Sequence, residues 1–268
     1  MLIGDKGQNL IFVLSQPRVG STMLQRILGG HPDIYTTSEP WLMLPALRVL
    51  SDRAHQDGPE GSWARRNVQS FITTLPRGRE EYNEAIRRMY VPLYSSILEK
   101  EGKRIFLDKT PRYAYAIPEL IDIFPEATYL FLFRNPLAVL CSFAHTWAGY
   151  DVELLDVHSD RSDLLQVPSL LMEGLDRLGW RGLILQYERL VVSPETELAG
   201  LCHRLGLDFS KDMIDYGGDK LPRWNFGDHF VYNYSRPAAE KARAWQNEIK
   251  HPVPVSYTHL TLPTILRV

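Results

Sequence analysis

Residues 10–30 combine the chemical groups with which proteins bind small anions. Five apolar residues open this stretch, a turn containing Pro and Gly follows, and apolar residues then recur at helical spacing. These patterns predict a buried strand, a tight loop and the start of a helix. The free N–H groups near Gly20, Ser21 and Thr22, the helix dipole and the guanidinium of Arg18 would favour bound phosphate or sulfate. Unless the hydroxyls simply cap an ordinary turn, the stretch is an anion site.

The loop lacks a residue that nucleoside-triphosphate hydrolases need. The Walker A motif is a glycine, four residues, then Gly-Lys and Ser or Thr. Here Gly20 is followed directly by Ser21, and Ser15 is not a glycine. Because the lysine is missing, ATP hydrolysis is disfavoured.

A second candidate anion site begins at Arg134. Asn135 and Pro136 are typical of an N-cap and of a first helical residue. Ser142, seven residues after the cap, then shares its helix face. This hydroxyl and the planar guanidinium could hold a second phosphate, although Ser142 could instead bond its own helix backbone.

These candidates follow short apolar segments that alternate with helical patterns. Beyond the opening strand, strands are predicted at 104–108, 128–133 and 182–187. Continuous apolar strands separated by helices indicate an α/β protein, with a parallel central sheet flanked by helices. Such sheets bind ligands at the carboxyl ends of their strands. In this chain those ends carry Arg18, Lys109, Arg134 and Tyr187.

Composition and charge argue against several function classes. The 268 residues have a formal net charge of −2, so the overall charge gives no electrostatic reason to expect nucleic-acid binding. The chain shows no secretory leader and no apolar run of about 18 residues, so we expect no membrane span and a cytoplasmic location. Cys141 and Cys202 lie in apolar surroundings, which favours a reduced protein. No Cys or His spacing predicts a metal.

We expect a single domain over residues 1–254. Within it, the polar and helical patterns of 51–100 predict an inserted helical flap that would act as a substrate lid. Residues 255–268 do not continue the preceding pattern and are interpreted as a non-native tail. The alternative for the tail is a genuine apolar strand.

The two anchors together resemble motifs of one enzyme family. Residues 16–22 (Gln-Pro-Arg-Val-Gly-Ser-Thr) resemble the 5′-phosphosulfate loop of sulfotransferases that use 3′-phosphoadenosine 5′-phosphosulfate (PAPS). Residues 134–142 begin with an arginine and end with a serine, as the 3′-phosphate motif of that family does. The resemblance covers nearly the whole chain before the tail, with the two motifs in the same order. The resemblance implies a P-loop NTPase-like fold. It also implies transfer of a sulfuryl group from PAPS, the co-substrate, to an acceptor hydroxyl or amine.

The resemblance also assigns nucleotide contacts. The phosphosulfate would be held by Arg18, Gly20, Ser21 and Thr22, and the 3′-phosphate by Arg134 and Ser142. Tyr187 matches a tyrosine that approaches the nucleotide in relatives; the alternative is a buried strand aromatic. Gly227 and Arg236 fall in a region that resembles a late Gly-Asp loop closing over the nucleotide.

Sulfuryl transfer needs charge stabilisation and a base for the acceptor proton. Arg18 would lie where charge develops, and Lys109 could stabilise the bridging oxygen unless it is a solvated loop lysine. Glu39 resembles the base of the tyrosylprotein-type branch by its offset from a His-Pro-Asp tripeptide. The Pro-Trp pair after it would raise the pKa of its carboxyl. Alternatively, Glu39 pairs with a cation for structure, and His55 of the flap is the base.

Two other functions stay open. A P-loop-like nucleotide kinase would share the first strand and loop, but the missing lysine and the second anchor disfavour it. A non-catalytic protein that binds 3′-phosphoadenosine 5′-phosphate (PAP) would keep Arg18 and Arg134 without needing Glu39 and Lys109. The aromatic and basic residues of 51–100 would suit a small-molecule or carrier-tethered acceptor. Neither the acceptor nor the oligomeric state follows from the sequence.

Overall fold

The computed structural model describes residues 2–53, 59–148, 160–218 and 221–248. The strands are β1 (Leu10–Ser15), β2 (Ile34–Thr36), β3 (Ile105–Lys109), β4 (Thr128–Phe133) and β5 (Gly182–Gln186). The α-helices are α1 (Ser21–Gly29), α2 (Leu44–Arg48), α3 (Pro59–Ile72), α4 (Gly78–Glu101), α5 (Ile117–Ile123), α6 (Pro136–Phe143), α7 (Asp160–Leu165), α8 (Val167–Leu178), α9 (Tyr187–Val192), α10 (Pro194–Leu205) and α11 (Trp245–Glu248).

Several single turns complete the elements. The 3-10 turns are η1 (Pro111–Ala116), η4 (Gly179–Arg181), η5 (Lys211–Ile214), η7 (His229–Asn233) and η8 (Ala239–Ala242), and η2 (Ala144–Ala148) is a π-helical turn.

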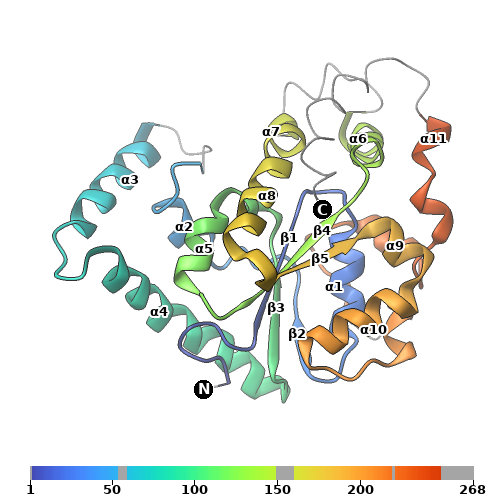
Figure 1. The fold of residues 1–268 in the computed structure, drawn as a ribbon, viewed down its shortest axis with the longest axis horizontal. Coiled ribbons are helices and arrows are strands. Elements are labelled where there is room, and N and C mark those ends of the chain that lie inside the picture. The colour runs from blue at the N-terminus through green and yellow to red at the C-terminus, as the bar shows by residue number, and fades with distance from the viewer. Residues whose placement is uncertain (1, 54–58, 149–159, 219–220, 249–268) are drawn as a thin grey trace.

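The five strands form one parallel sheet in the order β2-β3-β1-β4-β5. In the register, Val13 of β1 lies between Lys109 of β3 and Leu130 of β4. Figure 1 shows this sheet at the centre of the molecule with helices on both sides. The predicted α/β class is therefore confirmed. The central position of β1 explains why the loop after it faces the ends of both neighbouring strands.

Alternate side chains of the strands point into two separate cores. Ile11 and Val13 of β1 pack with residues of α1 and α10 on one face. Phe12 and Leu14 pack with residues of α4, α5 and α8 on the other face. Because both faces are covered, most strand positions need apolar residues, which is the pattern that the sequence shows except at polar strand ends such as those of β1 and β3.

The predicted helical insertion contains α3 and α4. The second half of α4 belongs to the core, because Tyr94 and Leu98 are almost completely buried and Tyr94 packs edge-on against Phe106 of β3. α3 instead leaves Trp63 and Phe71 exposed. The tail at 255–268 lies outside the described residues. In the ranges that the structure describes, no helix combines the length and apolar character needed to cross a bilayer.

Candidate active site

Three of the four predicted residues at the strand ends meet at one cavity. A cavity of about 310 Å³ is lined by Arg18 after β1, Arg134 after β4 and Tyr187 after β5. Gly20 and Ser142 line it as well. As predicted, Asn135 caps α6, because its side chain accepts hydrogen bonds from the N–H groups of residues 137 and 138. The cap directs α6, and with it Ser142, along the cavity wall.

Arg134 is held by two contacts that leave part of its guanidinium unpartnered. Its Nη1 donates a hydrogen bond of 2.9 Å to the carbonyl of Arg18. The guanidinium lies 4.3 Å from the centre of the Tyr187 ring, within the range of a cation–π contact. The Nε atom is buried and has no hydrogen-bond partner in the described ranges. Since such groups are normally bonded in proteins, a ligand anion in this cavity would satisfy the guanidinium.

Gly20 allows the loop to approach Tyr187. Its φ of +92° is a conformation that side chains with a Cβ rarely adopt. A Cβ built there would lie 2.6 Å from the Tyr187 ring, which is too close for packing. Burial raises the pKa of the Tyr187 hydroxyl, so the ring stays uncharged at neutral pH. The glycine is therefore required by both backbone conformation and space.

Arg18 connects the two predicted anion sites. Its φ of +66° is unusual for a non-glycine residue. Its Nε donates to the hydroxyl of Ser142 over 3.2 Å, and its Nη1 lies 3.1 Å from a carboxylate oxygen of Asp228. One guanidinium thus spans the space between α6 and the late loop that contains Asp228.

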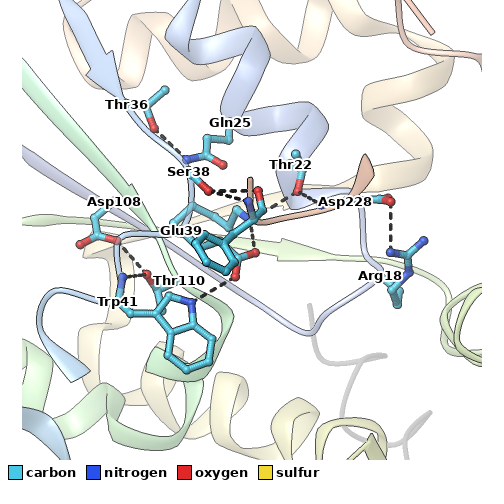
Figure 2. A network of polar contacts seen from close by, with 12 residues as sticks. Arg18, Thr22, Gln25, Thr36, Ser38, Glu39, Trp41, Asp108, Thr110 and Asp228 are labelled. Carbon is cyan, nitrogen blue, oxygen red and sulfur yellow. Dashed lines mark hydrogen bonds and ion pairs between the residues drawn. The ribbon is translucent and has the colours of Figure 1, made fainter. Parts of the chain in front are cut away.

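The start of α1 supports that late loop. Thr22 Oγ1 accepts hydrogen bonds from the N–H of Asp228, at 3.2 Å, and from Nζ of Lys109, at 3.4 Å (Figure 2). Gly227 has a φ of +101°, and a Cβ there would lie 3.3 Å from the same hydroxyl. The residue that caps α1 is Gly20, which has no side chain. The hydroxyl of Thr22 therefore binds the loop rather than capping its helix.

Glu39 and Lys109 form an ion pair at a second cavity. Glu39 Oε1 lies 2.6 Å from Lys109 Nζ, and its other oxygen, Oε2, accepts from Nε1 of Trp41 over 3.3 Å. The cavity, of about 250 Å³, is lined by Glu39 together with Gly20, Ser21 and Thr22. The carboxylate therefore sits at the same helix terminus that would hold the phosphosulfate.

Lys109 is the last residue of β3 and its side chain is only 1% exposed. Solvation on a loop, the alternative left open by the sequence, is therefore wrong. Burial lowers the pKa of Lys109, while the neighbouring Glu39 raises it. The structure does show a cation paired with Glu39, and that cation is itself a candidate catalytic residue.

Among the described residues, two predicted site residues, Lys109 and Arg236, line neither of these cavities. The backbone carbonyl of Arg236 accepts a hydrogen bond from the Tyr216 hydroxyl. Lys241 lines the larger cavity instead. A hydrogen bond with Tyr234 raises the pKa of Lys241, which therefore carries its positive charge into the cavity. His55 lies outside the described residues.

Sequence reasoning missed a buried carboxylate behind the site. Asp108 is fully buried and accepts hydrogen bonds from the hydroxyls of Tyr94, Tyr113 and Thr110, at 2.8, 3.0 and 3.1 Å. Burial raises its pKa to about 6 against these three donors, which lower it. The sequence feature that could have indicated this buried carboxylate is an aspartate, next to a lysine, directly after the apolar residues of β3. Among the described residues, no group of three or more His, Cys, Asp or Glu side chains could hold a metal ion.

Comparison with known proteins gives consistent matches. The family model described as "Sulfotransferase family" matches residues 10–211. The nodulation protein NoeE of Sinorhizobium fredii is 32% identical over 90% of this chain, and the chain spans only 60% of the length of that relative.

Two solved structures share the fold. The sulfotransferase domain from the curacin biosynthetic pathway superposes with a TM-score of 0.66 at 22% identity, covering 94% of this chain and 96% of that domain. A mouse sulfotransferase complexed with PAP gives a TM-score of 0.53 at 12% identity, covering 98% and 88% of the two chains. The P-loop-like α/β fold expected from the motifs is thus shared with both structures. With the family match over most of the chain, these findings show that the protein belongs to the sulfotransferase family.

Proposed function

We propose that this chain transfers the sulfuryl group of PAPS to an acceptor hydroxyl or amine. The observation that carries the proposal is the geometry of Arg18, which contacts Ser142 of one predicted phosphate site and lies in the loop of the other. A ligand with phosphate groups at both ends would fit the two adjoining cavities. The PAP in the mouse sulfotransferase of the same fold supports this choice of ligand.

The charges of the larger cavity suit such a nucleotide. Its described lining includes the cations Arg18, Arg134 and Lys241 and the single carboxylate of Asp228. We place the 3′-phosphate at Arg134 and Ser142, since the guanidinium has an unpartnered buried nitrogen. The 5′-phosphosulfate would lie against the N–H groups at the start of α1, next to Arg18.

The ion pair supplies groups for the chemistry. PAPS brings an activated sulfuryl group, and its leaving group is the 5′-phosphate of PAP. Glu39 would take the acceptor proton as the new oxygen–sulfur bond forms and the bond from sulfur to the bridging oxygen breaks. Lys109, which contacts both Glu39 and Thr22, would stabilise the charge that develops on the bridging oxygen. Holding all groups in place supplies much of the rate.

A small-molecule or carrier-tethered acceptor would enter through the smaller cavity. Glu39 lies in its wall, which also contains Arg112 and Asp163, whose side chains are hydrogen-bonded to each other at 2.7 Å. A cytoplasmic location would suit Cys141 and Cys202, which are buried and form no disulfide with any described residue. Both assignments extend the proposed function beyond the family match.

Ligand stabilisation of the folded chain tests the proposal. PAP at 100 times its dissociation constant should raise the unfolding free energy by about 2.7 kcal/mol, detected as a higher Tm in scanning calorimetry. Adenosine 5′-phosphate should give a smaller shift, because it lacks the 3′-phosphate. A larger shift with ATP and Mg²⁺ than with PAP would favour a kinase instead. PAP binding without sulfate transfer to any acceptor in a mass-based screen would favour a non-catalytic binding protein.

A further inference from the structure

One aromatic side chain in the wall of the smaller cavity has no assigned role. Trp41 lies two residues after Glu39 and lines that cavity with it. We propose that Trp41 is the acceptor-binding residue, and that its indole supports an acceptor whose reacting hydroxyl is carried on a six-membered ring with an apolar face. This inference rests on the proposed sulfuryl transfer and specifies the substrate class of that same site.

The backbone of Trp41 is held in an unfavourable conformation. Its φ of +53° is rare for a bulky residue, and such outliers persist only where the surroundings impose them, often at functional sites. The N–H of Trp41 donates to Thr110 Oγ1 over 3.3 Å. Thr110 in turn donates to the buried carboxylate of Asp108. The conformation is therefore fixed from the core of the protein.

The side chain of Trp41 is fixed as well. Its Nε1 donates to Glu39 Oε2, while Lys109 holds Oε1 of the same carboxylate. Figure 2 shows the indole beside Glu39, with its nitrogen directed to the carboxylate. The residue stays 41% exposed although it is so firmly anchored. An exposed, immobilised aromatic ring next to a candidate base has the properties of a binding surface.

The rest of the cavity wall selects the kind of acceptor. Apart from the indole, the wall contains two prolines and the charged residues Arg18, Glu39, Arg112, Asp163 and Asp228. A ring stacked on the indole could direct its hydroxyl at Glu39 while its polar substituents meet these groups. A straight alkyl chain has no ring face to stack on the indole, so it would lose this contact. The shared chemistry, a hydroxyl on a ring with one apolar face, is met by a pyranoside and by a phenol.

Three variants separate this role from a structural one. Trp41→Ala removes the ring, Trp41→Phe keeps an aromatic face without the N–H donor, and Trp180→Ala removes a tryptophan that is 90% exposed elsewhere. The probes are methyl β-D-glucopyranoside, 4-nitrophenol and 1-hexanol. Binding of each to the PAP-saturated protein is measured by saturation-transfer NMR, and sulfation of each by mass. PAP affinity is measured by calorimetry.

We expect at least one ring probe to bind more tightly than 1-hexanol. Trp41→Ala should weaken its binding or raise its KM about tenfold, with PAP affinity unchanged. Trp41→Phe should restore acceptor binding but lower kcat, because Glu39 loses one contact. Trp180→Ala should match the parent protein. The ring probe whose binding Trp41→Ala weakens shows whether the acceptor ring is that of a pyranoside or that of a phenol.

The inference is overturned if neither ring probe binds the PAP-saturated protein, or if Trp41→Ala changes binding of 1-hexanol and the ring probes equally. It is also overturned if Trp41→Ala abolishes PAP binding, since the residue would then support the fold. If the parent protein does not bind PAP at all, the proposed function itself fails. The PAP measurement therefore distinguishes the two failures.

Discussion

At the scale of single residues, Glu39 and Arg134 are both positioned by contacts from distant parts of the chain. Glu39 is bonded on one oxygen by Lys109 of β3 and on the other by its neighbour Trp41. Arg134 is fixed between the Arg18 carbonyl and the Tyr187 ring. Each side chain is therefore held in one orientation. Substitutions at these two residues should then separate effects on PAP binding from effects on the transfer step.

Replacing Glu39 by glutamine tests the proposed base. Glu39→Gln keeps the shape but removes the proton acceptor, so kcat should fall about 10²- to 10⁴-fold, while PAP affinity changes little. Steady-state rates and calorimetric PAP binding measure the two effects. Because the change also leaves the buried Lys109 without its carboxylate, the variant's Tm is compared with that of the double variant Glu39→Gln, Lys109→Met. Unchanged turnover would transfer the role to His55.

Replacing Arg134 by alanine tests the 3′-phosphate site. Arg134→Ala should weaken PAP binding on the order of 100-fold, the cost of losing a buried guanidinium–phosphate contact. Binding of adenosine 5′-phosphate should weaken far less, because that ligand has no 3′-phosphate. Calorimetric titration with both ligands gives the ratio. Equal losses would show that Arg134 supports the loop through the Arg18 carbonyl and does not read the 3′-phosphate.

At the scale of elements, α1 organises the site from both of its ends. Its first turn supports the late loop through Thr22. Further along, the buried guanidinium of Arg26 donates to the carbonyls of residues 216, 221 and 222 and lies 5.2 Å from the centre of the Trp224 ring and 5.0 Å from that of the Tyr232 ring. The late loop is therefore attached to α1 at two points, so disturbing the start of α1 should disturb both cavities.

A matched pair of glycine substitutions tests this element. Gly20→Ala places a Cβ against the Tyr187 ring at a positive φ, whereas Gly102→Ala also has a positive φ, +64°, but meets no atom within 4 Å. Both should lose about 1–3 kcal/mol of unfolding free energy from backbone strain. Only Gly20→Ala should also weaken PAP binding, by displacing Tyr187 from Arg134. Urea unfolding and calorimetry measure the two effects, and equal PAP affinity in both variants would contradict the close approach.

At the scale of the whole molecule, the site is supported by a polar cluster enclosed in a hydrophobic core. Asp108 is the penultimate residue of β3, and its side chain lies among Tyr94 and Tyr113 on the α4 face of the sheet. Its pKa of about 6 lies above its usual value of 3.8. Between pH 4 and pH 6, Asp108 therefore keeps its proton in the folded state, whereas in the unfolded chain it has already lost it. As the pH rises through that window, Asp108 reduces stability, and above pH 6 the reduction stays constant.

Comparison with Asp108→Asn isolates this contribution from all other titrations. The stability of the parent protein relative to the variant should fall between pH 4 and pH 6, by on the order of 2–3 kcal/mol, and then level off. Urea unfolding of both proteins at pH 4, 5, 6 and 7 measures the difference. A difference that stays constant across this range would show that Asp108 keeps the same charge throughout.

The sequence predicted those features that depend on local patterns. The bounds of β4, the Asn135 cap and the strand-end placement of Arg18 and Arg134 follow from residues within one or two turns of each other. The contacts between Thr22 and Asp228 and between Lys109 and Glu39 join residues far apart in the chain. Such contacts depend on how loops pack, which periodicity does not encode. For the same reason the burial of Lys109 and the cluster around Asp108 were not anticipated.

The contact between Asp228 and Arg18 changes how the affinity for PAPS, the sulfuryl donor, should respond to ionic strength. The chain already supplies a carboxylate 3.1 Å from the guanidinium that the phosphosulfate is proposed to meet. Binding would then exchange one negative group for another at Arg18, instead of neutralising an isolated cation. Added salt screens the attraction between unlike charges. Here it weakens the contact of Arg18 with Asp228 in the free protein as well as the contact of Arg18 with the phosphosulfate in the complex. We therefore expect PAPS affinity to fall with salt less steeply than the number of charges on the nucleotide implies.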